Sequence, residues 1–180
     1  MQTRLRFLAV IAAMLCMPIL AFAKNNAAPL GFELGVATYA QIKHAYPGVS
    51  VPVDAGLPEP GYTESTIDGS ALNIEGVERC DFTFNQQKVL SGVSLTMTKD
   101  INGAVKLLSR KYKMTGNHVD SFMGNGSAFF SKGHSTIVVI AKQLSFDMNV
   151  VYIMNNLRDS IIQNVRKDKA NSQRRKESAL

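Results

Sequence analysis

The sequence has 180 residues with 20 Lys and Arg, 14 Asp and Glu, and a formal net charge of +6. The positive excess lies at the two ends: Arg4 and Arg6 near the start, and seven basic against three acidic residues from Arg158 onward. Residues 24–157 are therefore neutral overall, which excludes an extended basic face and argues against nucleic-acid binding. The length suits one domain with a core of its own.

Residues 1–23 are predicted to be a secretory signal peptide. Arg4 and Arg6 precede the apolar run FLAVIAAMLCMPILAFA, which closes on a small-x-small site at Ala21–Ala23. A membrane anchor is the alternative, but a run of about 17 residues is at the short limit for a spanning helix, and Pro18 interrupts it. We therefore expect a periplasmic or secreted protein, cleaved near Ala23, and not a transmembrane one.

The cysteines bear on two further questions. A lipoprotein signal needs a small residue before its cysteine, but Leu15 precedes Cys16. Cleavage near Ala23 would leave Cys80 alone, without an internal disulfide. Cys80 shares its phase with Phe82 and Phe84, which predicts a buried thiol that packs as a small apolar group. A bridge to another chain and a reactive nucleophile are the alternatives.

The first half of the chain predicts one helix followed by strands. Residues 24–30 read as a flexible leader. Thr38 is a candidate N-cap for a helix whose apolar residues Tyr39, Ile42 and Tyr46 share one face, and Pro47-Gly48 ends it. The loop 49–63 is rich in Pro and Gly. Strands follow around Leu72 and Ile74, in CDFTFN and in KVLSGVSLTMT, the last two joined as a hairpin by Gln86-Gln87-Lys88.

The second half repeats this order. INGAVKLLSRKYKM predicts a helix with a stripe of Ile101, Val105, Leu108 and Tyr112, ended by Thr115-Gly116. Alternating strands are predicted in SAFFSK, TIVVIAK and FDMNVVYIM. Leu157, Ile161 and Val165 indicate a short final helix, and residues 166–180 are expected to be a basic disordered tail.

Two stretches 57 positions apart suggest an internal duplication: DGSALNIEG at 68–76 and NGSAFFSKG at 125–133. The same offset places Phe82 on Val139 and Leu95 on Tyr152, and an odd slip would turn every such side chain to the other face. The helices align at an offset of 66 instead. An unrelated run of strands with similar hairpin turns is the alternative.

These patterns predict an α+β fold in a single domain over residues 31–165. It would consist of a tandem αβββ repeat, 31–99 and 100–157, followed by a C-terminal helix. The strands are expected to form an antiparallel sheet with helices packed on one face. The other face would carry the polar residues of the strands, namely Asp81, Thr83, Ser94, Thr96, Asp147 and Asn149.

GFELGVATYAQIKHAYPG, an irregular loop and then CDFTFNQQKVLSGVSLTM resemble the helix-then-strands unit of small envelope proteins. The unit occurs as a tandem repeat in the beta-lactamase inhibitor protein and singly in outer-membrane-assembly lipoproteins of the SmpA/OmlA type. The resemblance covers most of Gly31 to Met154. It implies a periplasmic binding or inhibitory module and no catalyst, and it carries over no site residue.

Residues with catalytic or metal-binding chemistry form no recognisable motif. His44, His118 and His134 are far apart and have no second ligand at metal-binding spacing, so we expect no metal and no cofactor. No nucleophile elbow, phosphate loop or carboxylate pair stands out. An enzyme assembled from scattered residues remains the least favoured alternative.

Two segments are candidates for partner binding. The Pro-rich loop offers Leu57 and Tyr62 on a preordered backbone, although it can also be a mere connector. The tail offers Arg174, Arg175 and Lys176, which can attract an acidic partner or an anionic envelope surface, or can simply be a solvated terminus. The sequence therefore predicts a non-enzymatic module that recognises another protein, for example as an inhibitor or an immunity-type protein. The alternative is an envelope-associated accessory protein held by its basic tail.

Overall fold

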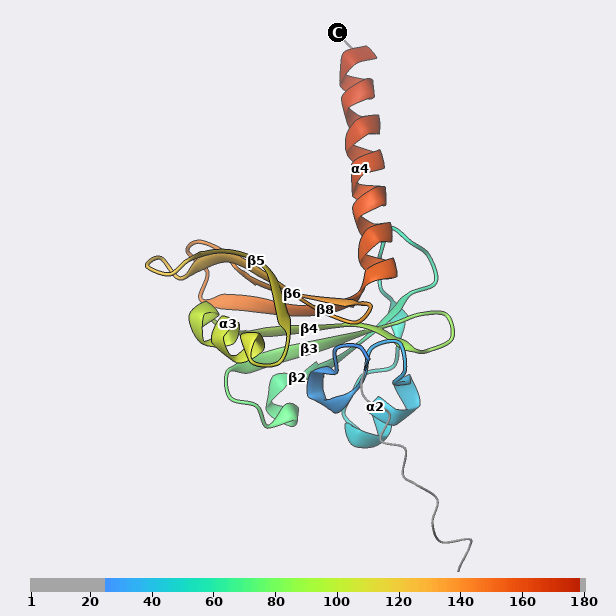
Figure 1. Cartoon of the computed structure of the whole chain (residues 1–180). Helices are drawn as coiled ribbons and strands as arrows, with labels where there is room; N and C mark the ends of the chain where they lie inside the picture. Colours follow the sequence, from blue (N-terminus) through green and yellow to red (C-terminus); the bar gives the residue numbers. More distant parts are fainter. Residues whose placement is uncertain (1–24, 179–180) are drawn as a thin grey trace, which may run out of the picture.

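The computed structural model describes residues 25–178, so the predicted signal peptide lies outside the described residues. The chain is a mixed α+β protein built on one antiparallel sheet of eight strands, in the order β1-β2-β3-β4-β8-β7-β6-β5 (Figure 1). The strands are β1 Val53–Asp54, β2 Thr63–Asp68, β3 Val77–Phe84, β4 Leu90–Thr98, β5 Lys113–Asp120, β6 Asn125–Lys132, β7 Ser135–Ala141 and β8 Asp147–Met154. The helices are α2 Tyr39–Ala45, α3 Ile101–Ser109 and α4 Asn155–Ser178, with 3-10 turns η1 Pro29–Gly31 and η2 Gly69–Leu72.

The last strands of the two halves, β4 and β8, join at the centre of the sheet. Val93 pairs with Tyr152, and Leu95 pairs with Val150. The sequence offset of 57 relates Val93 to Val150 and Leu95 to Tyr152, so each pair maps onto the other when the halves are exchanged. β3 and β7 extend this agreement, because Cys80 pairs with Leu95 as Ile137 pairs with Tyr152. We call the paired strands β4 and β8 the central seam.

One face of the sheet carries the core. Phe82, Val93, Tyr152 and Ile137 lie in one row across β3, β4, β8 and β7, and all are buried. Tyr39 of α2 meets Phe84 edge to face at 5.6 Å between ring centroids. Tyr112, just after α3, meets Tyr152 at 6.2 Å. The segments with α2 and α3 therefore cover the same face, at its two ends.

The opposite face carries the predicted polar residues, with one difference. Asp81 faces away from Phe82 but is only 7% exposed, because its neighbours on the same face enclose it. Thr66 Oγ1 donates to Asp81 Oδ1 at 2.8 Å, and Arg79 Nε donates to Oδ2 at 3.0 Å. Asp81 is therefore a local structural acceptor and not a solvent-exposed charge.

Local predictions for the first helix and for Cys80 are confirmed. Thr38 caps α2 in a reciprocal capping box with Gln41, which satisfies backbone donors at the helix start. Cys80 is free and fully buried. Burial, and next the charge of Asp81, raise the pKa of its thiol, so Cys80 stays protonated and unreactive in the folded chain.

The strand count of each half differs from the prediction. The second half contains β5, Lys113–Asp120, where the sequence predicted the end of a helix and a loop. β5 is an edge strand with exposed side chains, so it lacks the alternating apolar pattern that marks a half-buried strand. In the first half, the strand predicted around Leu72 and Ile74 is wrong, because this stretch forms η2 and the connection to β3. With β1 and β2, which precede it, each half has four strands.

The two stretches that suggested the duplication do not occupy equivalent places. Residues 68–76 span the end of β2, the turn η2 and the connection to β3, whereas 125–133 form β6 and its following turn. The strand pairing instead makes β2 equivalent to β6, at an offset of 63 residues. Ile67 of β2 pairs with Cys80, and Phe130 of β6 pairs with Ile137, the residue 57 positions after Cys80. The longer β2–β3 connection, which contains η2, accounts for the different offset.

The N-terminal segment is part of the fold from Asn26 on, in contrast to the expected flexible leader. Asn26 Nδ2 donates to the Leu34 carbonyl at 3.0 Å, and Asn26 Oδ1 accepts from the His134 N–H at 2.8 Å. The Ala27 N–H donates to Ser135 Oγ at 2.8 Å. These bonds attach the segment to the β6–β7 turn.

The C-terminal residues also differ from the prediction of a disordered tail. α4 continues as one helix to Ser178 and leaves the sheet at the end of β8 (Figure 1). Leu157 is buried, and Arg158 Nη1 donates to Thr136 Oγ1 at 2.5 Å. Residues 166–177 are all exposed, so α4 is anchored to the fold by its first turns.

Candidate functional site: an exposed apolar cluster at two hairpin tips

Four large apolar side chains are exposed in the turns at one end of the sheet. Phe122 is 95% exposed and Met123 50% exposed in the β5–β6 turn, while Leu144 is 94% and Phe146 89% exposed in the β7–β8 turn. We call these four residues the hairpin-tip cluster. Exposed apolar groups of this size at one place are characteristic of surfaces that meet a partner, whereas isolated ones are ordinary.

Local hydrogen bonds fix the β5–β6 turn in this shape. Asp120 Oδ1 accepts from the N–H groups of Phe122 at 2.9 Å and Met123 at 3.0 Å. The Asp120 carbonyl accepts from the Gly124 N–H at 2.8 Å. An Asp side chain that bonds the backbone two residues later is a standard turn former. The turn is therefore ordered by its backbone, and its two apolar side chains are left to solvent.

The β7–β8 turn is closed in a similar way. The Ser145 N–H donates to the Lys142 carbonyl at 3.4 Å, and the Asp147 N–H donates to Ser145 Oγ at 3.2 Å. Leu144 sits at φ 60°, a left-handed conformation that costs free energy for a residue with a Cβ. Leu144 therefore combines a strained backbone with a nearly fully exposed apolar side chain.

Both turns are attached to the stretch from Lys99 to the first turn of α3, which brings the four side chains to the same end. The Lys99 N–H donates to the Phe146 carbonyl at 2.8 Å, and Lys99 Nζ donates to the Lys142 carbonyl at 3.2 Å. Asn102 Nδ2 donates to the Ser121 carbonyl at 3.4 Å. Figure 1 shows the two turns together at the end of the sheet away from α4.

The charges around the cluster are mixed. Two lysines and three aspartates lie in or next to the turns: Lys99, Lys142, Asp100, Asp120 and Asp147. Asp100 is already engaged at the start of α3, where its Oδ1 accepts from the Gly103 N–H at 2.9 Å. The cluster is therefore an exposed apolar surface with a polar border of mixed charge.

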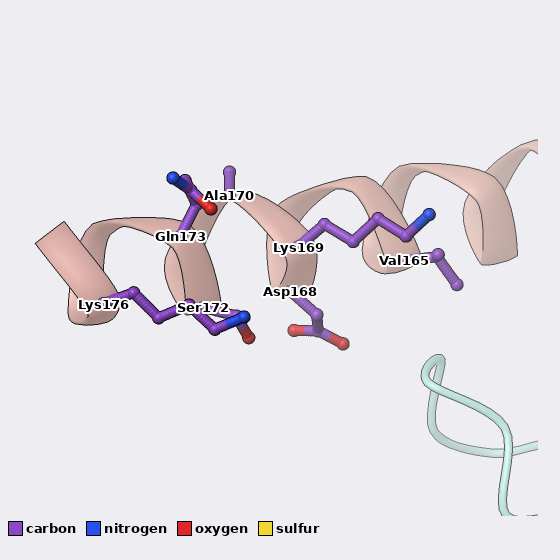
Figure 2. A pocket seen from close by; sticks show the side chains of 7 residues that line it. All are labelled: Val165, Asp168, Lys169, Ala170, Ser172, Gln173 and Lys176. Carbon is purple, nitrogen blue, oxygen red and sulfur yellow. The ribbon is translucent and has the colours of Figure 1, made fainter.

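The predicted residues Leu57 and Tyr62 lie elsewhere, in the loop between β1 and β2, and both are half-buried. The Ala55 N–H donates to the Tyr62 carbonyl at 3.1 Å, which closes the loop. Burial, and next the charge of Glu59, raise the pKa of the Tyr62 hydroxyl. In Figures 1 and 2 this loop lies beside the lower part of α4.

Arg174, Arg175 and Lys176 lie in the last turns of α4 and are exposed. Arg174 is 16 residues beyond Arg158, about 24 Å along the helix axis at 1.5 Å per residue. α4 therefore carries these charges away from the sheet, and the structure does not bring them together with Leu57 and Tyr62.

A hollow on α4 does not provide a site either. Figure 2 shows its lining, and all of it comes from neighbouring turns of this one helix: Val165, Asp168, Lys169, Ala170, Ser172, Gln173 and Lys176. A recess between side chains of a single exposed helix leaves a ligand open to water on its other sides, so it lacks the enclosure of a binding pocket.

The described residues show no metal-binding or membrane-spanning feature. Within 25–178 no group of three or more His, Cys, Asp or Glu residues could hold a metal ion. His118 lies against the Phe129 ring, with centroids 6.2 Å apart, and His44 and His134 are exposed. No helix in this part of the chain is both long and apolar enough to cross a membrane.

The hairpin-tip cluster was not among the residues predicted from the sequence, although a signal for it was present. Phe122-Met123 and Leu144 with Phe146 stand in SFMGNG and KQLSFD, among residues typical of turns. Apolar residues in a turn cannot face a core through strand alternation. That the two turns are neighbours follows only from the strand order.

Comparison with known proteins gives no relative for this chain. No family model, curated protein or solved structure matches it.

Proposed function

We propose that this chain is a non-enzymatic binding module that recognises another protein, exported to the periplasm or secreted once residues 1–23 are removed. The observation that carries the proposal is the hairpin-tip cluster, in which Phe122, Leu144 and Phe146 are each at least 89% exposed. Exposed aromatic side chains on ordered turns need little further ordering on binding, and aromatic residues dominate the binding energy of many interfaces.

The charge around the cluster favours a protein over a lipid surface. Three aspartates accompany two lysines at these turns, so the tip offers no net attraction to anionic head groups. Side chains that protrude from two neighbouring turns fit an apolar recess on a partner. This is the arrangement expected of an inhibitor or an immunity-type protein, which inserts loops from a rigid scaffold.

We further propose that the scaffold is a tandem repeat whose unit is one helix and four strands. The matched register of β3 and β4 with β7 and β8, and the exchange symmetry of the central seam, support this proposal. The sheet order also supports it, since β1 to β4 run inward from one edge as β5 to β8 do from the other. Two copies joined at their last strands would place their turns at opposite ends of the sheet.

Site-directed photocrosslinking tests the proposed recognition surface. A photoreactive amino acid at position 122 or 146 should give one covalent adduct of defined mass in an envelope extract of the natural host. The same group at position 51 serves as the matched control, because Val51 is also exposed, at 74%, but lies outside the cluster. An excess of unlabelled wild-type protein should make the adduct disappear, whereas the same excess of a variant with Phe122, Leu144 and Phe146 all changed to Ser should leave it.

The expected competitor result is specific: wild-type protein suppresses the adduct, and the triple Ser variant fails to do so while keeping the wild-type melting temperature. Equal adducts from positions 51, 122 and 146 would contradict the proposal. Crosslinking to lipid alone would also contradict it and would identify the tips as membrane-inserting.

A second candidate function, attachment to an anionic envelope surface, is favoured by α4. Its exposed part carries Arg166, Lys167, Lys169, Arg174, Arg175 and Lys176 against Asp168 and Glu177. Removing residues 167–180 should release the protein from vesicles of phosphatidylglycerol, and 0.5 M salt should release the intact chain, because screening weakens such contacts. Binding that survives both changes would contradict this function.

A further inference from the structure

A second apolar feature, which shares no residue with the hairpin-tip cluster, lies on the core-bearing face of the sheet. It is a cleft of about 330 Å³, at the lower end of the range of about 300–1,000 Å³ found for small-molecule sites. Its lining is apolar apart from one lysine and two tyrosines: Ala28, Pro29, Leu30, Ile74, Leu95, Met97, Ala104, Leu107, Leu108, Lys111, Tyr112, Val150 and Tyr152.

The central seam provides the lining from the sheet. Leu95 and Met97 of β4 and Val150 and Tyr152 of β8 line the cleft, and Leu95 pairs directly with Val150. These side chains are rigidly held because both strands have a neighbour on each side. The lining is therefore preformed by the fold.

The remaining lining comes from α3 and the two residues Lys111 and Tyr112 after it, from Ile74 before β3, and from the N-terminal segment around η1. Hydrogen bonds of Asn26 and Ala27 to Leu34, His134 and Ser135 attach the N-terminal segment to the fold. Leu107 on α3 is 61% exposed and Ile74 before β3 is 41% exposed, and both line the cleft. The cleft thus continues into exposed apolar surface, as expected of an opening that admits an apolar chain.

Lys111 is the only charged residue in the lining, and it makes no ion pair with any residue in the described range 25–178. It belongs to a stretch, 101–119, that has four basic residues and no acidic one, namely Lys106, Arg110, Lys111 and Lys113. Glu75 follows Ile74 but does not line the cleft. The charge in the lining of the cleft is therefore positive.

The two tyrosines add neutral polar groups. Burial raises the pKa of both Tyr112 and Tyr152, so both hydroxyls stay protonated at neutral pH. Burial is the larger effect on Tyr112, and the backbone of Ala28 beside its hydroxyl lowers the pKa by less. Protonated hydroxyls can donate to an oxyanion near Lys111, whereas a cationic ligand would find no acceptor of negative charge in the lining.

We propose that this cleft binds the acyl chain of a fatty-acid carboxylate, with the carboxylate at Lys111. The apolar lining suits an acyl chain. The unpaired ammonium of Lys111 at one side of the cleft favours a negatively charged head group. A recess of this volume accepts one chain of medium length, which favours a single-chain amphiphile over the surface of a bilayer.

Calorimetric titration of the exported, delipidated protein tests the proposal with three probes of equal chain length below their micellar concentrations. Laurate should bind with one site per chain, dodecanol should bind more weakly, and dodecyltrimethylammonium should bind most weakly of the three. Lys111→Gln should weaken laurate by about two- to fivefold, the range of an exposed ion pair, and should leave dodecanol unchanged.

Matched variants separate this site from other effects. Lys106→Gln removes an equal charge from α3 outside the lining and should change laurate affinity less than Lys111→Gln. Ala104→Phe should fill the cleft and abolish binding of both laurate and dodecanol, and Leu107→Ser provides a milder change if that variant does not fold. The triple Ser variant of the hairpin tips should bind laurate like the wild type.

The proposal is overturned if laurate shows no saturable site, if the cationic probe binds as well as laurate, or if Lys111→Gln and Lys106→Gln have equal effects. Loss of laurate binding in the hairpin-tip variant would also overturn it, since the ligand would then sit at the tips. Because the readout is direct binding, its result is independent of whether a protein partner is found.

Discussion

Ser65 shows how a single polar atom can lower stability inside this core. Its Oγ is the buried side-chain atom without a hydrogen-bond partner among the described residues, and the residue is fully buried. Ser65 of β2 pairs with Phe82 of β3. At the equivalent place in the second half, Ala128 of β6 pairs with Val139 of β7, so an alanine stands there in place of the serine. A buried hydroxyl without a partner keeps its desolvation cost.

Ser65→Ala is therefore expected to raise the free energy of unfolding by about 1 kcal/mol. Chemical denaturation with urea, followed by circular dichroism, measures the change, and an unchanged slope would show that the folded state is the same. A matched control is Ser94→Ala on the opposite, polar face, where little change is expected. A clear loss of stability in Ser65→Ala would mean that the hydroxyl has a partner.

Cys80 gives a pH dependence of known sign. Burial raises its pKa above the ordinary value of 9.0, so the unfolded chain releases this proton at a lower pH than the folded chain does. The contribution of the Cys80 thiol to the free energy of unfolding is fully present below pH 9. Above pH 9 this contribution is lost, by at most about 1.4 kcal/mol per pH unit.

Comparison of the wild type with Cys80→Ala between pH 8 and 10.5 isolates this effect, because other groups titrate equally in both. The wild type should lose stability faster above pH 9, and its thiol should react with a disulfide reagent only after unfolding. Rapid reaction of the folded protein at pH 8 would contradict a buried thiol.

At the scale of elements, α4 divides into an anchored and a solvated part. Leu157 is 1% exposed, whereas Ile162 is 41% and Val165 44% exposed. Beyond Val165 the helix contains no apolar residue larger than Ala170. A helix that is polar on all sides obtains little stability from tertiary packing, so the distal part depends on the anchored one.

Leu157→Ala should lower the free energy of unfolding by about 2–5 kcal/mol, the cost of removing a buried leucine side chain. Ile162→Ala on the same helix should cost much less, because that side chain is already partly in water. Urea denaturation of both variants measures the contrast. Similar losses in the two variants would mean that α4 packs over a longer length than its exposure indicates.

At the scale of the whole molecule, the central seam decides how the halves assemble. Ser94 pairs with Val151, the residue 57 positions later, so the seam is centred on equivalent residues of the two halves. In the first half alone, β4 would become an unpaired edge with Val93 and Leu95 on its apolar face. Such an edge is a template for pairing with another strand.

A fragment of residues 25–99 is therefore expected to form a symmetric dimer in which β4 of a second copy takes the place of β8. Light scattering after size-exclusion chromatography measures the mass, and adding residues 100–178 should convert the dimer to a heterodimer. A folded monomer, or a chain without cooperative unfolding, would contradict the exchange symmetry of the seam.

The sequence alone determined the features that rest on contacts between near neighbours. The phase of Cys80, Phe82 and Phe84 followed from the two-residue period of a strand, and the N-cap at Thr38 from bonds within four residues. β5 was not predicted because an exposed edge strand lacks this alternating pattern. The helical tail was not predicted because exposed polar residues are compatible with both a helix and a disordered segment.

Only the tertiary structure decided which strands lie together. The pairing of β4 with β8, the meeting of the turns that carry Phe122 and Phe146, and the cleft at Lys111 all join residues distant in the chain. Such contacts depend on how a whole apolar face is covered, since many strand orders bury the same alternating residues equally well. Local periodicity carries no information that separates these orders.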